Sequence, residues 1–218
     1  DDVVTSVQDL LEELDEQPLP ASAGIELTEG WATWGIAQAL YDQGMWSQLT
    51  DALEAAQDGD GGPLSELGRT YAGRDSGGEY ASNLLEALPA VNCLDRPEKD
   101  VDQDALVDKA VEAAPIWGRA LSSESPCSQW PVGATNTPHK VDAKGADPIL
   151  VVGTTRDPAT PYEWAQRLHE QLADSALITH EGDGHTAYMR QNSCVDTAVD
   201  QYWLTGVTPD GDELTCAE

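Results

Sequence analysis

The chain has 218 residues, of which 40 are Asp or Glu and 11 are Lys or Arg, so its formal net charge at pH 7 is −29. This charge argues against nucleic acid and anionic membranes as partners, because both would repel the chain. The length allows one or two domains, and the 40% hydrophobic content is compatible with a globular fold. An acidic field favours peptides that carry a free amino terminus or basic residues, although a merely solvating surface has the same composition.

The first part of the chain is predicted to be helical. Apolar residues recur at helical spacing over residues 3–14, and Pro18 stops this first helix. Further helices are predicted to begin near Thr28, Ser47 and Pro63 and to continue over residues 80–88, 104–114 and 116–121. No convincing strand precedes Leu121. We therefore predict an all-helical segment over residues 1–121.

Two features of this helical segment each allow two interpretations. The run of residues 58–62 (DGDGG) resembles part of a calcium loop. Gly62 stands at the fifth position of such a loop, where a carboxylate or amide is needed, and no Glu occupies the twelfth position, so a turn is favoured over a metal site. Trp31, Trp34 and Trp46 either line a substrate cleft or pack between helices, and packing is the commoner use.

Two predicted strands with a helix between them come later in the chain. Residues 122–146, rich in Ser, Pro and Thr, are predicted to form an irregular connection. Residues 149–152 and 176–179 are short apolar runs typical of strands buried on both faces. The helix between them is predicted to begin with Thr160 at the N-cap, Pro161 at the first helical position and Glu163 as the reciprocal acid of a capping box.

Asp157 and His185 each come just beyond one of these strands. A strand, a crossover helix and a parallel strand form a right-handed unit, with both carboxyl ends at one edge and about 4.8 Å between neighbours. A hydrogen bond between Asp157 and His185 is therefore predicted, which would fix the histidine tautomer and stabilise the imidazolium. Either residue alone is more often a loop residue, so the hypothesis depends on their occurring together.

The motifs around these residues resemble a known family. They are residues 153–162 (GTTRDPATPY), 182–188 (GDGHTAY), 194–196 (CVD), 90–95 (AVNCLD) and 127–131 (CSQWP). These motifs are similar to the cap and carboxyl-terminal region of actinobacterial tripeptidyl-aminopeptidase-like α/β-hydrolases, and the resemblance covers nearly all of the chain. It implies that Asp157 is the acid and His185 the general base of a Ser-His-Asp triad. It also implies a peptide substrate with a free amino terminus, with esterase activity in addition, and no metal or organic cofactor.

The serine of such a triad is not apparent in this sequence. These hydrolases carry it in a Gly-x-Ser-x-Gly elbow, and the 218 residues contain no such pattern. We therefore expect the nucleophile on an upstream segment, in the same precursor or in a second chain, and we expect this chain alone to be inactive. A physical argument agrees, because two parallel strands that are apolar on both faces cannot form a stable sheet by themselves.

The four cysteines lack the Cys-x-x-Cys spacing of zinc and thioredoxin-type sites. Their even number and wide spacing favour two disulfides and an exported protein, with four buried thiols as the alternative. Three pairings exist, and we predict Cys93–Cys127 and Cys194–Cys216 because each closes a local loop. The sequence shows no signal peptide, membrane-spanning run or lipidation motif, so we expect that any targeting segment has already been removed. From the cysteines we expect a secreted or envelope-associated protein.

The predicted fold class is α/β, with a helical cap over residues 1–121, an irregular connection over 122–146, and the carboxyl-terminal part of an α/β-hydrolase core over 147–218. The predicted function is that of the cap and carboxyl-terminal portion of a secreted serine peptidase or hydrolase, whose partners are the peptide substrate and the serine-bearing segment. The alternative is a non-catalytic, secreted acidic binding fragment. A fluorophosphonate probe would discriminate between these readings.

Overall fold

The computed structural model describes residues 2–22, 24–95, 102–122 and 126–217. The chain divides into two compact units. One unit contains Asp1–Gln38 and Ser47–Pro138, and the other contains Ala39–Trp46 and His139–Glu218. The short segment Ala39–Trp46, which the sequence analysis placed with the helices, thus belongs to the same unit as Asp157 and His185.

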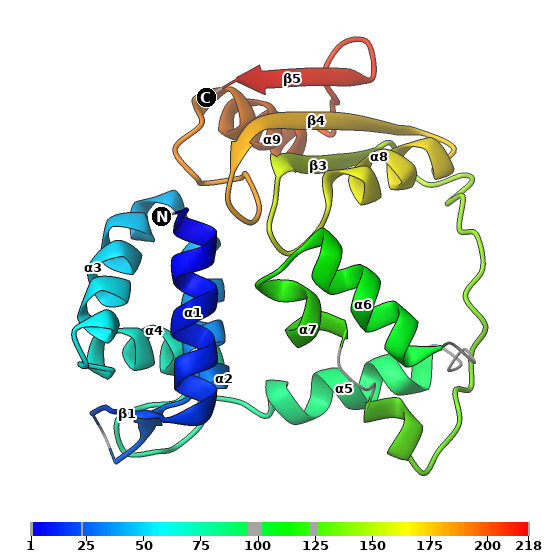
Figure 1. The fold of residues 1–218 in the computed structure, drawn as a ribbon. Helices are drawn as coiled ribbons and strands as arrows, with labels where there is room; N and C mark the ends of the chain where they lie inside the picture. The colour runs from blue at the N-terminus through cyan, green and yellow to red at the C-terminus, as the bar shows by residue number, and fades with distance from the viewer. Residues whose placement is uncertain (1, 23, 96–101, 123–125, 218) are drawn as a thin grey trace. The chain divides into compact units, whose positions relative to one another are not determined.

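The first unit is built from helices, as predicted (Figure 1). They are α1 (Val3–Glu16), α2 (Glu29–Leu40), α3 (Trp46–Gln57), α4 (Gly62–Ala72), α5 (Leu84–Asp95), α6 (Gln103–Ala113), α7 (Trp117–Ser122) and the 3-10 helix η2 (Pro126–Gln129). The apolar stripe predicted for α1 is buried and consists of Val7, Leu10, Leu11 and Leu14. Whether these helices act as a cap stays a prediction.

Helices α2 and α4 pack with their backbones close together. A Cβ atom on Gly35 of α2, or on Gly68 of α4, would lie 2.5 Å from a backbone carbonyl oxygen of the other helix. The Trp31 ring meets the Trp34 ring edge-on at 5.4 Å, and Trp34 lies 6.0 Å from the Tyr71 ring. These two tryptophans therefore pack within the helical unit, which is the commoner of the two uses weighed from the sequence.

Two details of this unit differ from the sequence analysis. The strands β1 (Leu19–Pro20) and β2 (Glu26–Leu27) form a small antiparallel pair where no strand was expected. Two residues per strand are too few to produce a recognisable alternation, so pairing alone defines them. The helix predicted over residues 80–88 begins instead at Leu84 and continues to Asp95, because Tyr80 is held in a β-bridge with Arg74.

The second unit contains a parallel sheet with the strand order β3-β4-β5. Its elements are η1 (Gln43–Met45), β3 (Ile149–Arg156), α8 (Tyr162–Gln171), β4 (Ser175–Asp183), α9 (Ser193–Thr205) and β5 (Glu213–Ala217). Helix α9 covers one sheet face, where Ile178 of β4 lies in a cluster with Val195 and Val199. Helix α8 covers the other face, where Tyr162 bonds Thr179. Successive strand residues point to opposite faces, so the two helices lie on opposite sides of the sheet (Figure 1).

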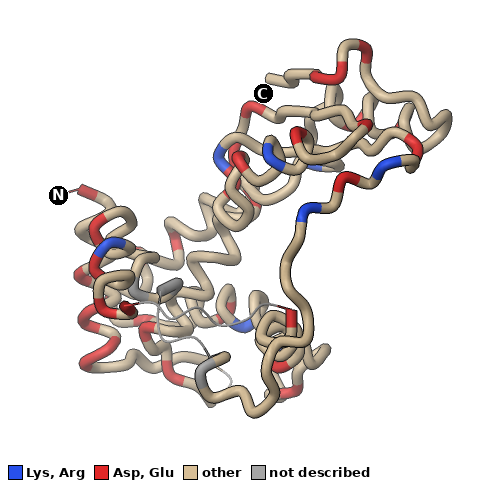
Figure 2. Tube along the Cα trace, turned by 90° about the vertical axis from the view of Figure 1, so that its right-hand side faces the viewer, with Lys and Arg blue, Asp and Glu red and all other residues tan. Residues whose placement is uncertain are grey.

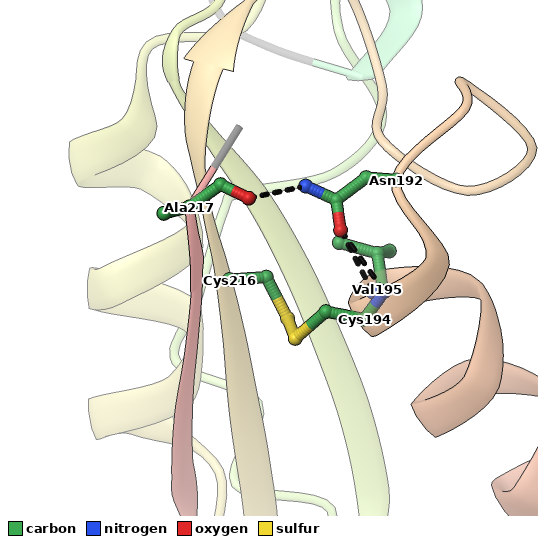
Figure 3. The surroundings of a disulfide bond; sticks show 5 residues. All are labelled: Asn192, Cys194, Val195, Cys216 and Ala217. Atoms are coloured by element: carbon green, nitrogen blue, oxygen red, sulfur yellow. Dashed lines mark hydrogen bonds between the residues drawn. A yellow bond between two sulfur atoms is a disulfide. The ribbon is translucent and has the colours of Figure 1, made fainter.

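The sheet has three strands, whereas the sequence analysis found two. Strand β5 was missed because only Leu214 and Cys216 of its five residues face the core. It is fixed to α9 by the Cys194–Cys216 disulfide and by a 2.8 Å hydrogen bond from the Asn192 amide to the Ala217 carbonyl (Figure 3). Within the described residues, the segment before Leu121 contributes no strand to this sheet, as predicted. In the same residues, no strand pairs with the outer edge of β3.

Both predicted disulfides are confirmed. Cys93 and Cys127 are joined with their Cα atoms 5.1 Å apart, and Cys194 and Cys216 are joined with their Cα atoms 5.7 Å apart. Each bond lies inside one unit. The second disulfide ties the last strand of the sheet to the helix that covers it.

Replacing both Cys194 and Cys216 by Ser should lower the free energy of unfolding of the second unit by about 3 kcal/mol, because the bond closes a loop with a sequence separation of 22. Amide hydrogen exchange in β5 should become faster. The matched double replacement of Cys93 and Cys127 should leave exchange in β5 unchanged. Unaltered β5 protection in the first variant would show that the disulfide is not what holds this strand.

Candidate functional site

Asp157 and His185 meet at the carboxyl edge of the sheet. Strands β3 and β4 pair in parallel, with Arg156 opposite Asp183, so the residues that follow them lie side by side. Nδ1 of His185 lies 3.0 and 2.9 Å from the two carboxylate oxygens of Asp157. The predicted hydrogen bond is therefore confirmed, and the pair has the geometry of an acid that orients a base.

The carboxylate of Asp157 is almost fully surrounded by donors. Its Oδ1 accepts the backbone N–H groups of Ala159 and Thr160, both at 2.8 Å. Its Oδ2 accepts the Thr160 hydroxyl at 3.0 Å and the Thr186 N–H at 3.4 Å. Burial by itself raises the pKa of Asp157, but the backbone donors of Thr160 and Ala159 and the side chains of His185 and Thr160 lower it by more. The net pKa lies below the usual value, so the carboxylate stays ionised beside the histidine.

Thr160 binds the Asp157 carboxylate and does not cap helix α8 as predicted. Helix α8 begins at Tyr162, Pro161 takes the N-cap position, and no side chain caps this end. The predicted capping box is thus wrong, because the Thr160 hydroxyl and N–H both bind Asp157. The signal in the sequence was the Asp-x-x-Thr spacing, since an Asp side chain that accepts from residues two and three positions later forms a local turn.

The imidazole of His185 is held on one nitrogen only. Nδ1 bonds Asp157, and the backbone N–H of His185 donates to the Tyr41 carbonyl at 2.9 Å. The Tyr41 and His185 rings lie 4.8 Å apart between centroids, at 52°. Among the described residues Nε2 has no hydrogen-bond partner. No pattern in the sequence indicated Tyr41, which lies far from His185 in the chain.

The loop that carries His185 contains several residues in the left-handed region. Gly184 has φ 95°, and the non-glycine residues Thr186, Met189 and Gln191 have φ 68°, 61° and 67°. Such conformations cost about 1–3 kcal/mol each for non-glycine residues and persist only where the surroundings enforce them. The loop is therefore strained, and its contacts must hold it in place.

A bidentate ion pair joins the two strand ends next to the acid and base. Nε and Nη2 of Arg156 donate to the two oxygens of Asp183 at 2.7 and 2.6 Å. This hydrogen bond lowers the pKa of Asp183. A register shift between Thr154 and Arg156 brings the partners opposite each other. Arg156 thus connects the ends of β3 and β4.

Acidic residues occur throughout both units rather than in one cluster (Figure 2). Within the described ranges, no group of three or more His, Cys, Asp or Glu side chains is arranged to hold a metal ion. None of the helices in those ranges is both long and apolar enough to cross a bilayer.

Gly184→Ala should destabilise the second unit by about 2 kcal/mol or more, because the new Cβ would combine positive φ with a 2.9 Å approach to the Tyr41 carbonyl oxygen. Gly206→Ala is the matched control, since Gly206 also has positive φ but has open space around it. Its cost should be confined to backbone strain, about 1 kcal/mol. Equal losses in urea unfolding would show that contact with Tyr41 does not constrain the loop.

Asp157→Asn should flatten the dependence of stability on acidic pH. The pKa of Asp157 is lower in the folded state than its usual value of 3.8, so its ionised form stabilises the fold above that value. This stability is lost as pH falls below 3.8 and through the folded-state pKa. Thermal unfolding between pH 2 and 7 should show a smaller acid-induced loss in the variant. An equal acid-induced loss of stability in both proteins would show that Asp157 does not contribute to this pH dependence.

Comparison with known proteins matches residues 114–216 to the family described as "TAP-like protein". The chain is 40% identical over 183 residues to "Serine protease Hip1" of Mycobacterium tuberculosis, covering 80% of this chain and 34% of that protein. It is 40% identical over 216 residues to "Carboxylesterase B" of the same species, covering 95% of this chain and 41% of that protein. It is 30% identical over 184 residues to "Tripeptidyl aminopeptidase" of Streptomyces lividans, covering 82% of this chain and 34% of that protein.

The chain thus spans less than half the length of these curated relatives. The matched region contains β3, β4 and nearly all of β5, together with Asp157 and His185. A parallel sheet with helices on both faces is consistent with part of an α/β-hydrolase. Residues 114–216 thus match the family described as "TAP-like protein", and the chain as a whole is similar to serine hydrolases and peptidases.

Proposed function

We propose that this chain is the cap and carboxyl-terminal portion of a secreted serine hydrolase, and that it supplies the acid and base of the catalytic triad. The observation that carries the proposal is the hydrogen-bonded pair Asp157 and His185 at the carboxyl edge of the sheet. A histidine whose Nδ1 is fixed by a carboxylate presents Nε2 as a general base. In this structure Nε2 is the nitrogen that the described residues leave without a hydrogen bond.

In the proposed reaction a serine hydroxyl attacks the carbonyl carbon of the scissile bond. Nε2 of His185 takes the serine proton during the attack and returns it to the leaving amine or alcohol. Asp157 holds the imidazole in the correct tautomer and stabilises the imidazolium that forms. A water molecule, activated by the same histidine, then hydrolyses the acyl-enzyme and releases the acid product. These steps need no metal or organic cofactor.

The proposal assigns the serine to a segment outside this chain. The sequence contains no Gly-x-Ser-x-Gly elbow, and no serine of the described part is hydrogen-bonded to His185. Strand β3 has no strand on its outer side within that part. A parallel sheet is stable when its edges are paired or covered, so the same segment would continue the sheet from β3.

The proposed substrates are peptides with a free amino terminus, with esters as a second class. The support is the similarity to relatives named as a tripeptidyl aminopeptidase, a serine protease and a carboxylesterase. The net charge of −29 favours substrates that bring a positive amino group. The two disulfides support a secreted or envelope-associated protein, because such bonds persist in oxidising compartments.

The 218-residue chain alone should show no labelling by a fluorophosphonate probe and no turnover of tripeptidyl or ester chromogenic substrates. Joined to a serine-elbow segment, or mixed with it as a second chain, it should become active. His185→Ala should then lower kcat by at least about a thousandfold. His139→Ala, at an exposed histidine outside the site, is the matched control and should retain activity.

Three outcomes would count against the proposal. Turnover by the purified chain alone that disappears in His185→Ala would place the nucleophile inside these residues. An active complex that is insensitive to His185→Ala would remove the assigned base. An inactive complex that binds peptides would favour the alternative of an acidic binding fragment.

A further inference from the structure

We infer that the turn at residues 41–43 braces the loop of residues 184–191 (the His185 loop), that is, holds it in its observed conformation. We also infer that Tyr41 is a positioning residue for the imidazole. The inference rests on the proposed role of His185 as a general base. The turn lies far from the loop in the sequence: Gln43 and Asp183, which are hydrogen-bonded, are 140 positions apart. The turn belongs to the same compact unit as the loop.

The first observation is that the loop cannot hold its own shape. Four of the residues from 184 to 191 lie in the left-handed region, and three of them are not glycine. Their conformations are unfavourable by themselves, so packing from outside must enforce them. The Asp157 carboxylate contacts this stretch only near its start, at His185 and Thr186.

The second observation is that Tyr41 contacts the loop through both backbone and side chain. Its carbonyl accepts the His185 N–H at 2.9 Å, and it lies so close to Gly184 that a Cβ atom there would be 2.9 Å away. Its ring lies 4.8 Å from the imidazole. The terminal torsion of a histidine is broad, so a hydrogen bond to one nitrogen leaves the ring free to rock. An aromatic ring against the imidazole restricts that motion.

The third observation is that the same turn holds both ends of the loop. The Asp42 carboxylate accepts from Nη1 of Arg190 at 2.7 Å, on the far side of His185. The Gln43 amide donates to Asp183 at 3.4 Å, on the near side. Asp42 also accepts the Gly44 N–H at 2.9 Å, which stiffens the turn itself. Residues 41–43 therefore contact the chain before, at and after His185, and so hold the whole loop and not one point of it.

The chemical consequence is a preorganised base. Proton transfer from a nucleophile requires Nε2 to lie within hydrogen-bond reach of the hydroxyl, and a small misplacement costs rate without weakening substrate binding. Asp157 fixes the ring through Nδ1, while Tyr41 limits its rotation through the ring face. Loss of the Tyr41 ring should therefore lower kcat more than it changes KM.

The test compares Tyr41→Ala with Tyr41→Phe in the chain joined to the serine-elbow segment. Tyr41→Ala should lower kcat about tenfold while KM stays within about twofold, because the ring acts on the base and not on the substrate. Tyr41→Phe should restore wild-type kcat, because it keeps the aromatic ring. Equal kcat in Tyr41→Ala and wild type, or failure of Phe to restore it, would overturn the inference.

A second measurement needs no activity and so separates this inference from the proposed function. Diethyl pyrocarbonate modifies accessible imidazoles, and peptide mass spectrometry of the 218-residue chain reads each histidine separately. Tyr41→Ala should raise the modification rate of His185 severalfold relative to exposed His139. Asp42→Asn, which removes only the ion pair with Arg190, should raise it less and covers the case in which Tyr41→Ala does not fold. An unchanged modification rate of His185 in the folded variants would overturn the inference that residues 41–43 hold the loop, even if the joined protein proves to be an active hydrolase.

Discussion

The parallel pairing of β3 and β4 is the constraint on which the site depends. Because both strands run in the same direction with Arg156 opposite Asp183, the loops that follow them leave the sheet at one edge. The irregular register between Thr154 and Arg156 and the bidentate bond from Arg156 to Asp183 join these ends. Helices α8 and α9 then cover opposite faces of the sheet, so Asp157 and His185 follow strands that are packed on both sides.

The acid and the base are stabilised in different ways. Asp157 takes three of its hydrogen bonds locally, from Ala159 and Thr160 within its own turn. His185 sits in a strained loop and needs partners from distant segments. Beyond the loop, Asn192 caps α9 through Cys194 and Val195 and also bonds Ala217 of β5 (Figure 3). Strain near a reacting group is common, because it prevents the group from relaxing out of position.

The surface next to β3 agrees with the proposal that another segment completes the sheet. Trp164 and Leu168 of α8 are 58% and 45% exposed, although they form the apolar stripe of that helix. Residues of this kind are normally buried against a neighbouring element. In the proposed complete enzyme, the segment that pairs with β3 would lie beside them and would bring the serine toward Nε2 of His185. In this proposal the same segment would meet both the outer edge of β3 and Nε2 of His185.

The sequence by itself determined the helical first part, the two strands at residues 149–152 and 176–179, both disulfides and the meeting of Asp157 with His185. Each of these depends on local periodicity, on loop closure or on the direction of parallel strands, and all three can be read along the chain. Only the tertiary structure decided that Thr160 binds Asp157 and does not cap the helix, that β5 joins the sheet, and that Tyr41 lies against His185. β5 and Tyr41 depend on partners far away in sequence, and Thr160 on a choice between two local partners. A single sequence carries no record of which distant groups come together, or of which partner a hydroxyl selects.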